Sequence, residues 1–254
     1  MTDAFADIVE DRVLGERLRL LQPRRGHRAG TDALLLAATV PEAFRGHAAD
    51  LGAGVGTVGL AAAVLAPSVR VTLVERDAGA LDLARRNIAL NRLEERVSAA
   101  GADLFSAAGR RDAGLRESAG LVLTNPPFHA EGQVRRSPEA ARRAAHILDG
   151  GTLDDWMRAC ADVLEPGGVV VVIHRADALA DLLAAGEGRF GALNVRPVHP
   201  RAGEAAVRVL VAGVKGSRAP LRLLPPVVLH EADGRFSPLL EAVNRGEARI
   251  ALTL

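Results

Sequence analysis

The sequence predicts an α/β fold in which a mainly parallel sheet carries helices on both faces. Short β-rich runs alternate with amphipathic or alanine-rich stretches along most of the chain. The run 169–174 is apolar throughout, as expected of a central strand that is covered on both sides. A length of 254 residues without an internal repeat suits one domain over 1–254. Residues 1–40 are expected to form an N-terminal extension packed on the core of this domain.

That extension is expected to hold a small hairpin and a helix. Residues 13–21 alternate between apolar and polar side chains, which indicates the hairpin. The segment 31–40 is a plausible helix that begins near an N-cap at Thr31 or Asp32 and ends at Pro41.

Strands and helices alternate behind the extension. Apolar or β-branched runs predict strands at 48–51, 69–74, 97–100, 120–124, 169–174, 193–198 and 206–214. Apolar residues spaced three or four apart predict helices at 57–65, 78–91, 152–164 and 176–185. The tail from Leu221 is interrupted by prolines and gives no clear element. Residues 128–151 are long for a connection and lack apolar periodicity, which is typical of functional loops.

Composition narrows the functional classes. No apolar run approaches the roughly 18 to 20 residues that cross a bilayer, and residues 1–12 do not resemble a signal peptide, so we expect a cytoplasmic protein. The only cysteine, Cys160, falls in an apolar helical pattern and is expected to be a buried thiol. No metal site is expected. The net charge of +1 makes the chain no polycation, although its arginines are locally clustered.

A glycine-rich turn, 52–56, closes the first strand of the main alternation and opens a helix. Glycines allow the backbone to turn sharply and approach a ligand closely. Glu75 follows at the end of the next strand, where a carboxylate can accept both hydroxyls of a ribose. Gly54, Gly56 and Gly59 also satisfy the pattern of nicotinamide or flavin sites, so that alternative competes.

Two acids favour S-adenosylmethionine over a dinucleotide. Asp50 directly precedes the turn and can face the cationic methionine end of that cofactor. Dehydrogenases normally have apolar residues at this strand end. Asp103 ends the third strand, where an acid can accept a hydrogen bond from the adenine amino group of the cofactor.

The motif Asn125-Pro126-Pro127-Phe128 follows the strand 120–124. Two prolines fix φ and remove two backbone donors, which leaves carbonyls free to accept. The Asn125 side-chain carbonyl and the Pro126 backbone carbonyl can therefore both accept from one planar NH2 group. An exocyclic amine is a poor nucleophile because its lone pair is delocalised, so two fixed acceptors can polarise and aim it. Phe128 can stack on a flipped base, and His129 is interpreted as a substrate contact or a solvent-facing residue.

This arrangement resembles the class I methyltransferase fold, in the branch that methylates amino groups through an Asn/Asp-Pro-Pro-aromatic motif. The resemblance implies a Rossmann-like, seven-stranded sheet whose last strand is antiparallel. The chain is also similar to the bacterial tRNA(Val) adenine-N6 methyltransferase family, in the segments 18–36, 124–128, 201–215 and 224–234. The Gly30-Thr31-Asp32 segment is more specific to this family, because the other motifs are shared by many methyltransferases.

The family resemblance assigns roles by position. It implies that the S-adenosylmethionine site comprises Thr31, Asp32, Asp50, Gly52, Gly54, Glu75 and Asp103. The target adenine would lie at Asn125 to Phe128. We expect the phosphate backbone of RNA, specifically of tRNA, to be contacted by two arginine clusters: Arg24, Arg25 and Arg28, and Arg135, Arg136, Arg142 and Arg143.

Three alternatives stay open. The acceptor pair serves any planar NH2 group, so a protein glutamine amide or the N2 amine of guanine in ribosomal RNA is also a possible target. Phe128-His129 departs from several relatives, which have tyrosine or asparagine there, and Phe-His also occurs in ribosomal guanine-N2 methyltransferases. The third alternative is a noncatalytic RNA-binding relative, which the intact Asn125 and glycine-rich turn disfavour.

Overall fold

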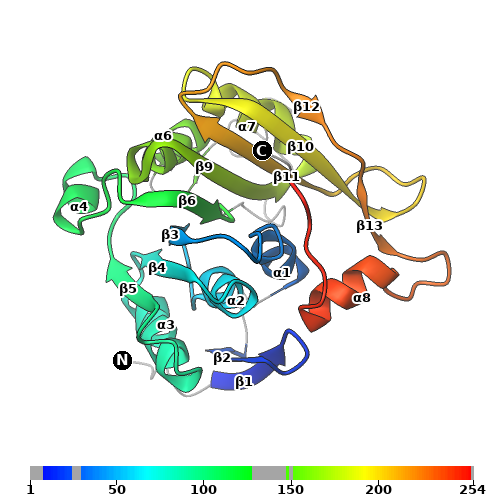
Figure 1. The fold of residues 1–254 in the computed structure, drawn as a ribbon, viewed down its shortest axis with the longest axis horizontal. Helices are drawn as coiled ribbons and strands as arrows, with labels where there is room; N and C mark the ends of the chain where they lie inside the picture. Colours follow the sequence, from blue (N-terminus) through cyan, green and yellow to red (C-terminus); the bar gives the residue numbers. More distant parts are fainter. Residues whose placement is uncertain (1–7, 25–29, 128–146, 149–150, 253–254) are drawn as a thin grey trace, which may run out of the picture.

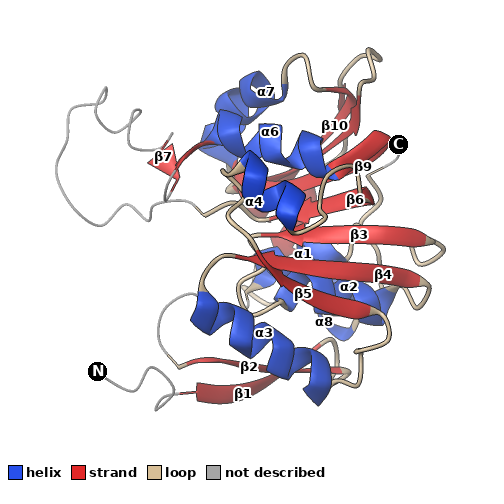
Figure 2. Ribbon diagram, turned by 90° about the vertical axis from the view of Figure 1, so that its left-hand side faces the viewer, coloured by secondary structure: helices blue, strands red, loops and turns tan. Residues whose placement is uncertain are grey.

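The computed structural model describes residues 8–24, 30–127, 147–148 and 151–252. Its central strands, in chain order, are β3 (Gly46–Leu51), β4 (Val69–Glu75), β5 (Val97–Gly101), β6 (Ala119–Thr124), β9 (Leu164–Arg175), β10 (Phe190–Arg201) and β11 (Arg208–Lys215). They lie side by side in the order β10-β11-β9-β6-β3-β4-β5. Figure 2 shows β10, β9, β6, β3, β4 and β5 in this order from top to bottom.

Strand β11 is the antiparallel member of these seven, because it runs against both of its neighbours, β9 and β10. The remaining pairs of the core are parallel. The predicted mainly parallel sheet with helices on both faces and an antiparallel last strand is therefore confirmed. The expected count of seven was too small for the described sheet. The short strands β12 (Arg222–Leu223) and β13 (Val227–His230) extend it beside β10, which gives nine strands.

The helices divide between the two faces of the sheet. Successive side chains of β6 point to opposite faces of the sheet. Leu121 and Leu123 belong to the hydrophobic cluster on one face, and Val122 belongs to the cluster on the other. The first face is covered by α1 (Thr31–Ala37), α2 (Thr57–Leu65), α3 (Ala78–Leu90) and α8 (Pro238–Arg245). The second face is covered by α6 (Leu153–Val163) and α7 (Leu179–Gly186), with the 3-10 turn η1 (Ala176–Ala178) leading into α7. The described part of the chain contains no helix that is both long and apolar enough to span a bilayer.

The N-terminal hairpin and the C-terminal tail lie together on the first face. The hairpin pairs β1 (Ile8–Val13) with β2 (Leu18–Pro23), which makes it longer than the expected 13–21. Asn87 on α3 holds β2 by accepting from the Leu21 N–H at 2.7 Å. The tail returns along α1, where the Ile250 N–H donates to the Ala38 carbonyl at 2.9 Å. Figure 1 shows α8, in red, beside α1 and this hairpin.

Local details differ from the sequence predictions at three places. The N-cap of α1 is Gly30 without a side-chain cap, so the expected cap at Thr31 or Asp32 is wrong. The reason is that the Asp32 carboxylate pairs with Arg208 instead, at 2.8 Å. A short helix, α4 (Ala107–Asp112), was not predicted. The two-residue strands β7 (Ile147–Leu148) and β8 (Gly151–Thr152) pair at the end of the 128–151 segment, most of which lies outside the described residues.

Candidate active site at the carboxyl ends of β3 and β6

The candidate site lies between β3 and β6, where the order in which the chain adds strands to the sheet reverses. Starting from β3, the chain adds β4 and β5 on one side and then returns to place β6 on the other. Loops that leave two such neighbouring strands diverge, which opens a crevice at their carboxyl ends. The glycine-rich turn follows β3 and the Asn-Pro-Pro motif follows β6, so the parallel pairing of these two strands brings both predicted motifs to the same end of the sheet.

The three glycines of the turn have positive φ values but different surroundings. Gly52, Gly54 and Gly56 have φ values of 74°, 55° and 91°. A Cβ at Gly52 would lie 2.9 Å from the Trp156 ring, and one at Gly56 would lie 2.7 Å from Leu73. A Cβ at Gly54 would have no atom of the described residues within 4 Å. Packing thus fixes the two outer glycines, whereas the middle one borders open space that a ligand can approach.

Glu75 ties the turn to the end of β4. Its Oε2 accepts from the Gly54 N–H at 2.8 Å. Its Oε1 accepts from the backbone N–H groups of Arg76 and Asp77 at 2.7 and 2.8 Å. The carboxylate therefore lies at the open glycine, where the sequence expected it, and its role toward ribose hydroxyls stays a prediction.

Asp50 is buried beneath the turn, with 1% of its surface exposed. Its Oδ2 accepts from the Gly59 N–H at 2.8 Å, which connects β3 to the first turn of α2. Burial raises the pKa of Asp50 to about 7, against the lowering effect of this hydrogen bond, and the charge of Glu75 raises it further. At least one carboxylate oxygen therefore faces inward, and a direct contact with a cofactor stays a prediction.

The remaining predicted cofactor residues lie at the same end of the sheet. Asp103 is exposed after β5, and its Oδ1 accepts from the Phe105 N–H at 2.9 Å. Thr31 and Asp32 begin α1 and are half-buried. The ion pair between Asp32 and Arg208 joins this helix end to β11.

Asn125 carries an unmet hydrogen-bonding group. Its Oδ1 is buried and has no hydrogen-bond partner within the described ranges. Pro126 next to it is buried, and Pro127 is exposed. An unpaired buried acceptor costs roughly 1–3 kcal/mol, so native structures rarely keep one without a reason. The atom that the sequence analysis assigned to an incoming NH2 group is thus available to receive it.

Several predicted residues fall elsewhere. Arg24 is exposed at the end of β2. Phe128 and His129 lie outside the described residues, as do Arg25, Arg28, Arg135, Arg136, Arg142 and Arg143. Cys160 is fully buried, which confirms the expected buried thiol, and this burial raises its pKa to about 12. In the part of the chain that the structure describes, no three His, Cys, Asp or Glu side chains gather as a metal site.

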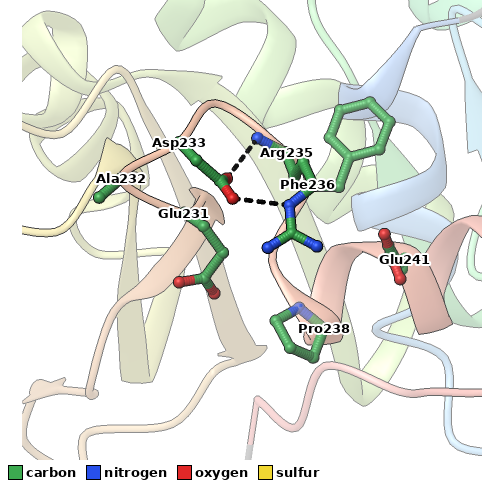
Figure 3. Close-up of a pocket in the computed structure, with 7 residues that line it drawn as sticks. All are labelled: Glu231, Ala232, Asp233, Arg235, Phe236, Pro238 and Glu241. Atoms are coloured by element: carbon green, nitrogen blue, oxygen red, sulfur yellow. Dashed lines mark hydrogen bonds and ion pairs between the residues drawn. The ribbon is translucent and has the colours of Figure 1, made fainter.

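A pocket between β13 and α8 contains none of the predicted site residues (Figure 3). It is lined by Glu231, Ala232, Asp233, Arg235, Phe236, Pro238 and Glu241. The Arg235 guanidinium is bound by Asp233 at 2.7 Å across its rim. This pocket shares no residue with the turns that follow β3 and β6.

Sequence reasoning missed two residues that connect the motifs. Thr124 and Trp156 are buried side chains joined by a hydrogen bond of 2.9 Å. Trp156 is the only tryptophan in a chain with 3% aromatic residues, and that rarity was the available signal.

Comparison with known proteins agrees with this geometry. Residues 28–185 match the family model of the methyltransferase small domain. The chain is 32% identical over 212 residues to a tRNA1(Val) (adenine(37)-N6)-methyltransferase of Aeromonas hydrophila, covering 83% of this chain and 85% of that one. It is 30% identical over 203 residues to a release factor glutamine methyltransferase of Xylella fastidiosa, covering 69% and 70%. A crystal structure of a predicted O-methyltransferase from Agrobacterium tumefaciens superposes with a TM-score of 0.73 at 34% identity, covering 87% and 98%.

Proposed function

The chain belongs to the methyltransferase small domain family, and we propose that it methylates the exocyclic N6 amine of an adenine in tRNA. S-adenosylmethionine is the cofactor. The relative from Aeromonas hydrophila, matched over most of both chains, supports the choice of base and RNA. Because another relative is named a release factor glutamine methyltransferase, the test below includes that amine as a separate target.

The buried Oδ1 of Asn125, which has no hydrogen-bond partner among the described residues, is the observation that carries the proposal. An amide oxygen without a partner can accept one N–H of a planar amine, and the Pro126 carbonyl can accept the other. The two acceptors orient the nitrogen lone pair and stabilise the positive charge that develops as its new bond forms. A proton then leaves the nitrogen to water. No strong base is required, because the transfer is helped by position and electrostatics.

The residues around the glycine-rich turn fit the cofactor. Gly54 borders open space, and Glu75 and Asp103 offer carboxylates at the ends of β4 and β5. We assign Glu75 to the ribose hydroxyls, Asp103 to the adenine amino group, and Asp50 with Thr31 and Asp32 to the methionine end. S-adenosylmethionine would supply an electrophilic methyl group, whose bond to the sulfonium sulfur breaks as the N–C bond forms, and would leave as the neutral thioether S-adenosylhomocysteine. The chain supplies the shape, the hydrogen bonds and the negative charge that hold it.

The arginine clusters are assigned to the RNA backbone. Replacing Arg135 and Arg136 together with alanine should weaken tRNA binding and reduce its dependence on salt, because each arginine lost removes a phosphate contact. Binding titrations at several salt concentrations measure both effects. S-adenosylmethionine affinity serves as the control and should not change. An unchanged tRNA affinity would contradict this assignment.

The decisive experiment is transfer from labelled S-adenosylmethionine to unmodified tRNA, followed by nucleoside mass spectrometry. We expect N6-methyladenosine. Parallel reactions with ribosomal RNA and with a protein carrying an accessible glutamine test the two other amines. Label on guanine N2 or on glutamine, with none on adenine, would replace the proposed substrate. Cofactor binding without transfer to any of the three would favour the noncatalytic relative.

A further inference from the structure

Trp156 lies between the two turns of the candidate site. It belongs to the first turn of α6, a helix that begins with a capping box made by Thr152 and Asp155. The cap fixes where α6 starts, and thereby which residue faces the end of the sheet. Only 5% of the Trp156 surface is exposed. The indole is therefore held against the ends of the strands from the second face of the sheet.

The indole N–H continues into a chain of two hydrogen bonds. Trp156 Nε1 donates to Thr124 Oγ1 at 2.9 Å, and Thr124 Oγ1 donates to the Leu51 carbonyl at 2.8 Å. Thr124 directly precedes Asn125, and Leu51 directly precedes Gly52. The Thr124 hydroxyl thus donates a hydrogen bond to β3 and accepts one from α6. These bonds thus connect the residues that immediately precede the two motifs.

The indole ring also shapes the glycine-rich turn. A Cβ at Gly52 would lie 2.9 Å from Cη2 and 3.0 Å from Cζ2 of Trp156, so the ring occupies the space of a side chain at that position. Phe105 contacts the ring edge-on, with 5.7 Å between the centroids. The Phe105 N–H in turn donates to Asp103 Oδ1. Trp156 therefore contacts residues of the loops after β3 and β5, and bonds the last residue of β6.

We propose that Trp156 is a positioning residue that sets the separation of the cofactor turn from the Asn125 acceptor. It touches neither of the reacting groups and acts through Thr124 and Gly52. Methyl transfer needs the amine nitrogen in line with the donor methyl, and a misplacement of 1 Å can cost about a hundredfold in rate. The inference rests on the proposed methyltransferase reaction for its kinetic part, whereas its effect on cofactor affinity is independent of the acceptor.

The test compares Trp156→Phe, Thr124→Val, the double variant and Thr124→Ser. Phenylalanine keeps a ring but removes the N–H, and valine removes the hydroxyl at nearly equal size. We expect each single variant to lower kcat at saturating S-adenosylmethionine by about tenfold or more. The double variant should be no worse than the poorer single one, because both break one chain of hydrogen bonds. Thr124→Ser keeps the hydroxyl and should retain most of the activity.

Calorimetric titration with S-adenosylmethionine gives a second readout. Trp156→Phe should weaken its binding several-fold because the support of Gly52 changes. Met157→Leu is the matched control, since Met157 is the next residue of the same helix and is equally buried, but approaches Gly186 instead of the turns. It should change neither kcat nor cofactor affinity.

A folded Trp156→Phe protein with unchanged kcat and unchanged cofactor affinity would overturn the proposal. Additive losses in the double variant would overturn the shared path through Thr124. If Trp156→Phe does not fold, the kcat of Thr124→Val tests the proposal in its place, and an unchanged kcat would overturn it. Failure of the proposed reaction is recognised separately, because the wild-type protein would then methylate no adenine while the differences in cofactor affinity persisted.

Discussion

The turn after β3 and the turn after β6 lie side by side, yet they satisfy their polar groups in opposite ways. In the first, Asp50 and Glu75 bind backbone N–H groups of the turn and its flanking segments. The backbone N–H groups of Gly52 and Ala53 donate to the Val74 carbonyl. In the second, Asn125 keeps a buried oxygen without a partner among the described residues.

Under the proposed function, this difference distinguishes a preformed cofactor site from the site of the reaction. A turn whose groups are satisfied internally keeps its shape before the cofactor arrives, which lowers the cost of ordering it on binding. A turn with a buried acceptor that has no hydrogen-bond partner is less stable than one in which the acceptor is paired. Such local losses of stability are expected at functional sites. We therefore expect substitutions in the first turn to affect stability and cofactor affinity, and substitutions in the second to affect turnover.

The largest effect is expected from Asn125→Ala. Removing one preorganised hydrogen-bonding group from a reacting centre typically lowers kcat by about 10²–10³-fold. The thermal midpoint should stay level or rise, because no partner in the described structure loses a bond and an unpaired buried oxygen is removed. Radiolabel transfer to tRNA measures kcat, and calorimetry measures unfolding and S-adenosylmethionine affinity.

Asn125→Asp is the control for this prediction, since it keeps an acceptor oxygen at the same place. It should retain more activity than the alanine variant. Full turnover by Asn125→Ala would refute the role of the acceptor. A marked fall in stability would show instead that Asn125 is a structural residue, and the contrast between the two turns would disappear.

Sequence patterns correctly predicted the elements that are determined by residues close together in the chain. Apolar periodicity located the seven core strands and the main helices, because burial on one or both faces dictates it over a few residues. They also placed Asp50, Glu75, Asp103 and Asn125 at strand ends, which the parallel topology then gathers at one edge. The short α4 has no such periodicity. It is defined by the Ser106 cap and by the buried Arg110, which pairs with Asp162 at 2.7 Å.

Contacts distant along the chain were beyond that reasoning. Nothing near Asp32 shows that Arg208 will pair with it, so a capping role was the natural expectation. The tail after Leu221 is held by remote groups, such as the Leu65 carbonyl that accepts from Arg249 at 2.6 Å. The place of Trp156 between the motifs depends on how α6 packs on the sheet. Each of these features requires the three-dimensional arrangement of elements that local patterns only identify.

The next prediction compares two glycines within the first turn. Gly54→Ala places its methyl group in open space, so the positive φ should cost only about 1–2 kcal/mol of folding free energy. The same methyl group would enter the region assigned to the cofactor. We expect the affinity for the cofactor to fall by about 1–3 kcal/mol, which is roughly fivefold to 150-fold.

Gly56→Ala should show the reverse pattern. Its Cβ would lie 2.7 Å from Leu73 in the core, at a φ of 91°, so overpacking should add about 1–3 kcal/mol to the strain. Urea unfolding and calorimetric titration compare the two proteins. Equal losses of cofactor affinity in both, after correction for the unfolded fraction, would place the cofactor away from Gly54.

The smallest effect concerns the pH dependence that Asp50 brings to the first turn. The pKa of Asp50 is raised by burial to about 7, so the native carboxyl holds its proton between about pH 4 and 7 while the unfolded one has lost it. Its contribution to the free energy of unfolding therefore decreases as pH rises through that window. The positive charge of the cofactor favours the ionised form. If only that form binds, a pKa near 7 makes affinity about tenfold weaker at pH 6 than at pH 8.

Asp50→Asn isolates this group, because the amide can still accept from the Gly59 N–H but does not titrate. Its cofactor affinity at pH 8 should fall below that of the wild type, and the tenfold change between pH 6 and 8 should vanish. If the cofactor itself titrates in this range, the difference in affinity between pH 6 and 8 would remain in Asp50→Asn. A pH dependence shared by both proteins would thus show that Asp50 serves only to hold α2 against β3. The first turn would then owe its charge complementarity to Glu75 and Asp103 at the other strand ends.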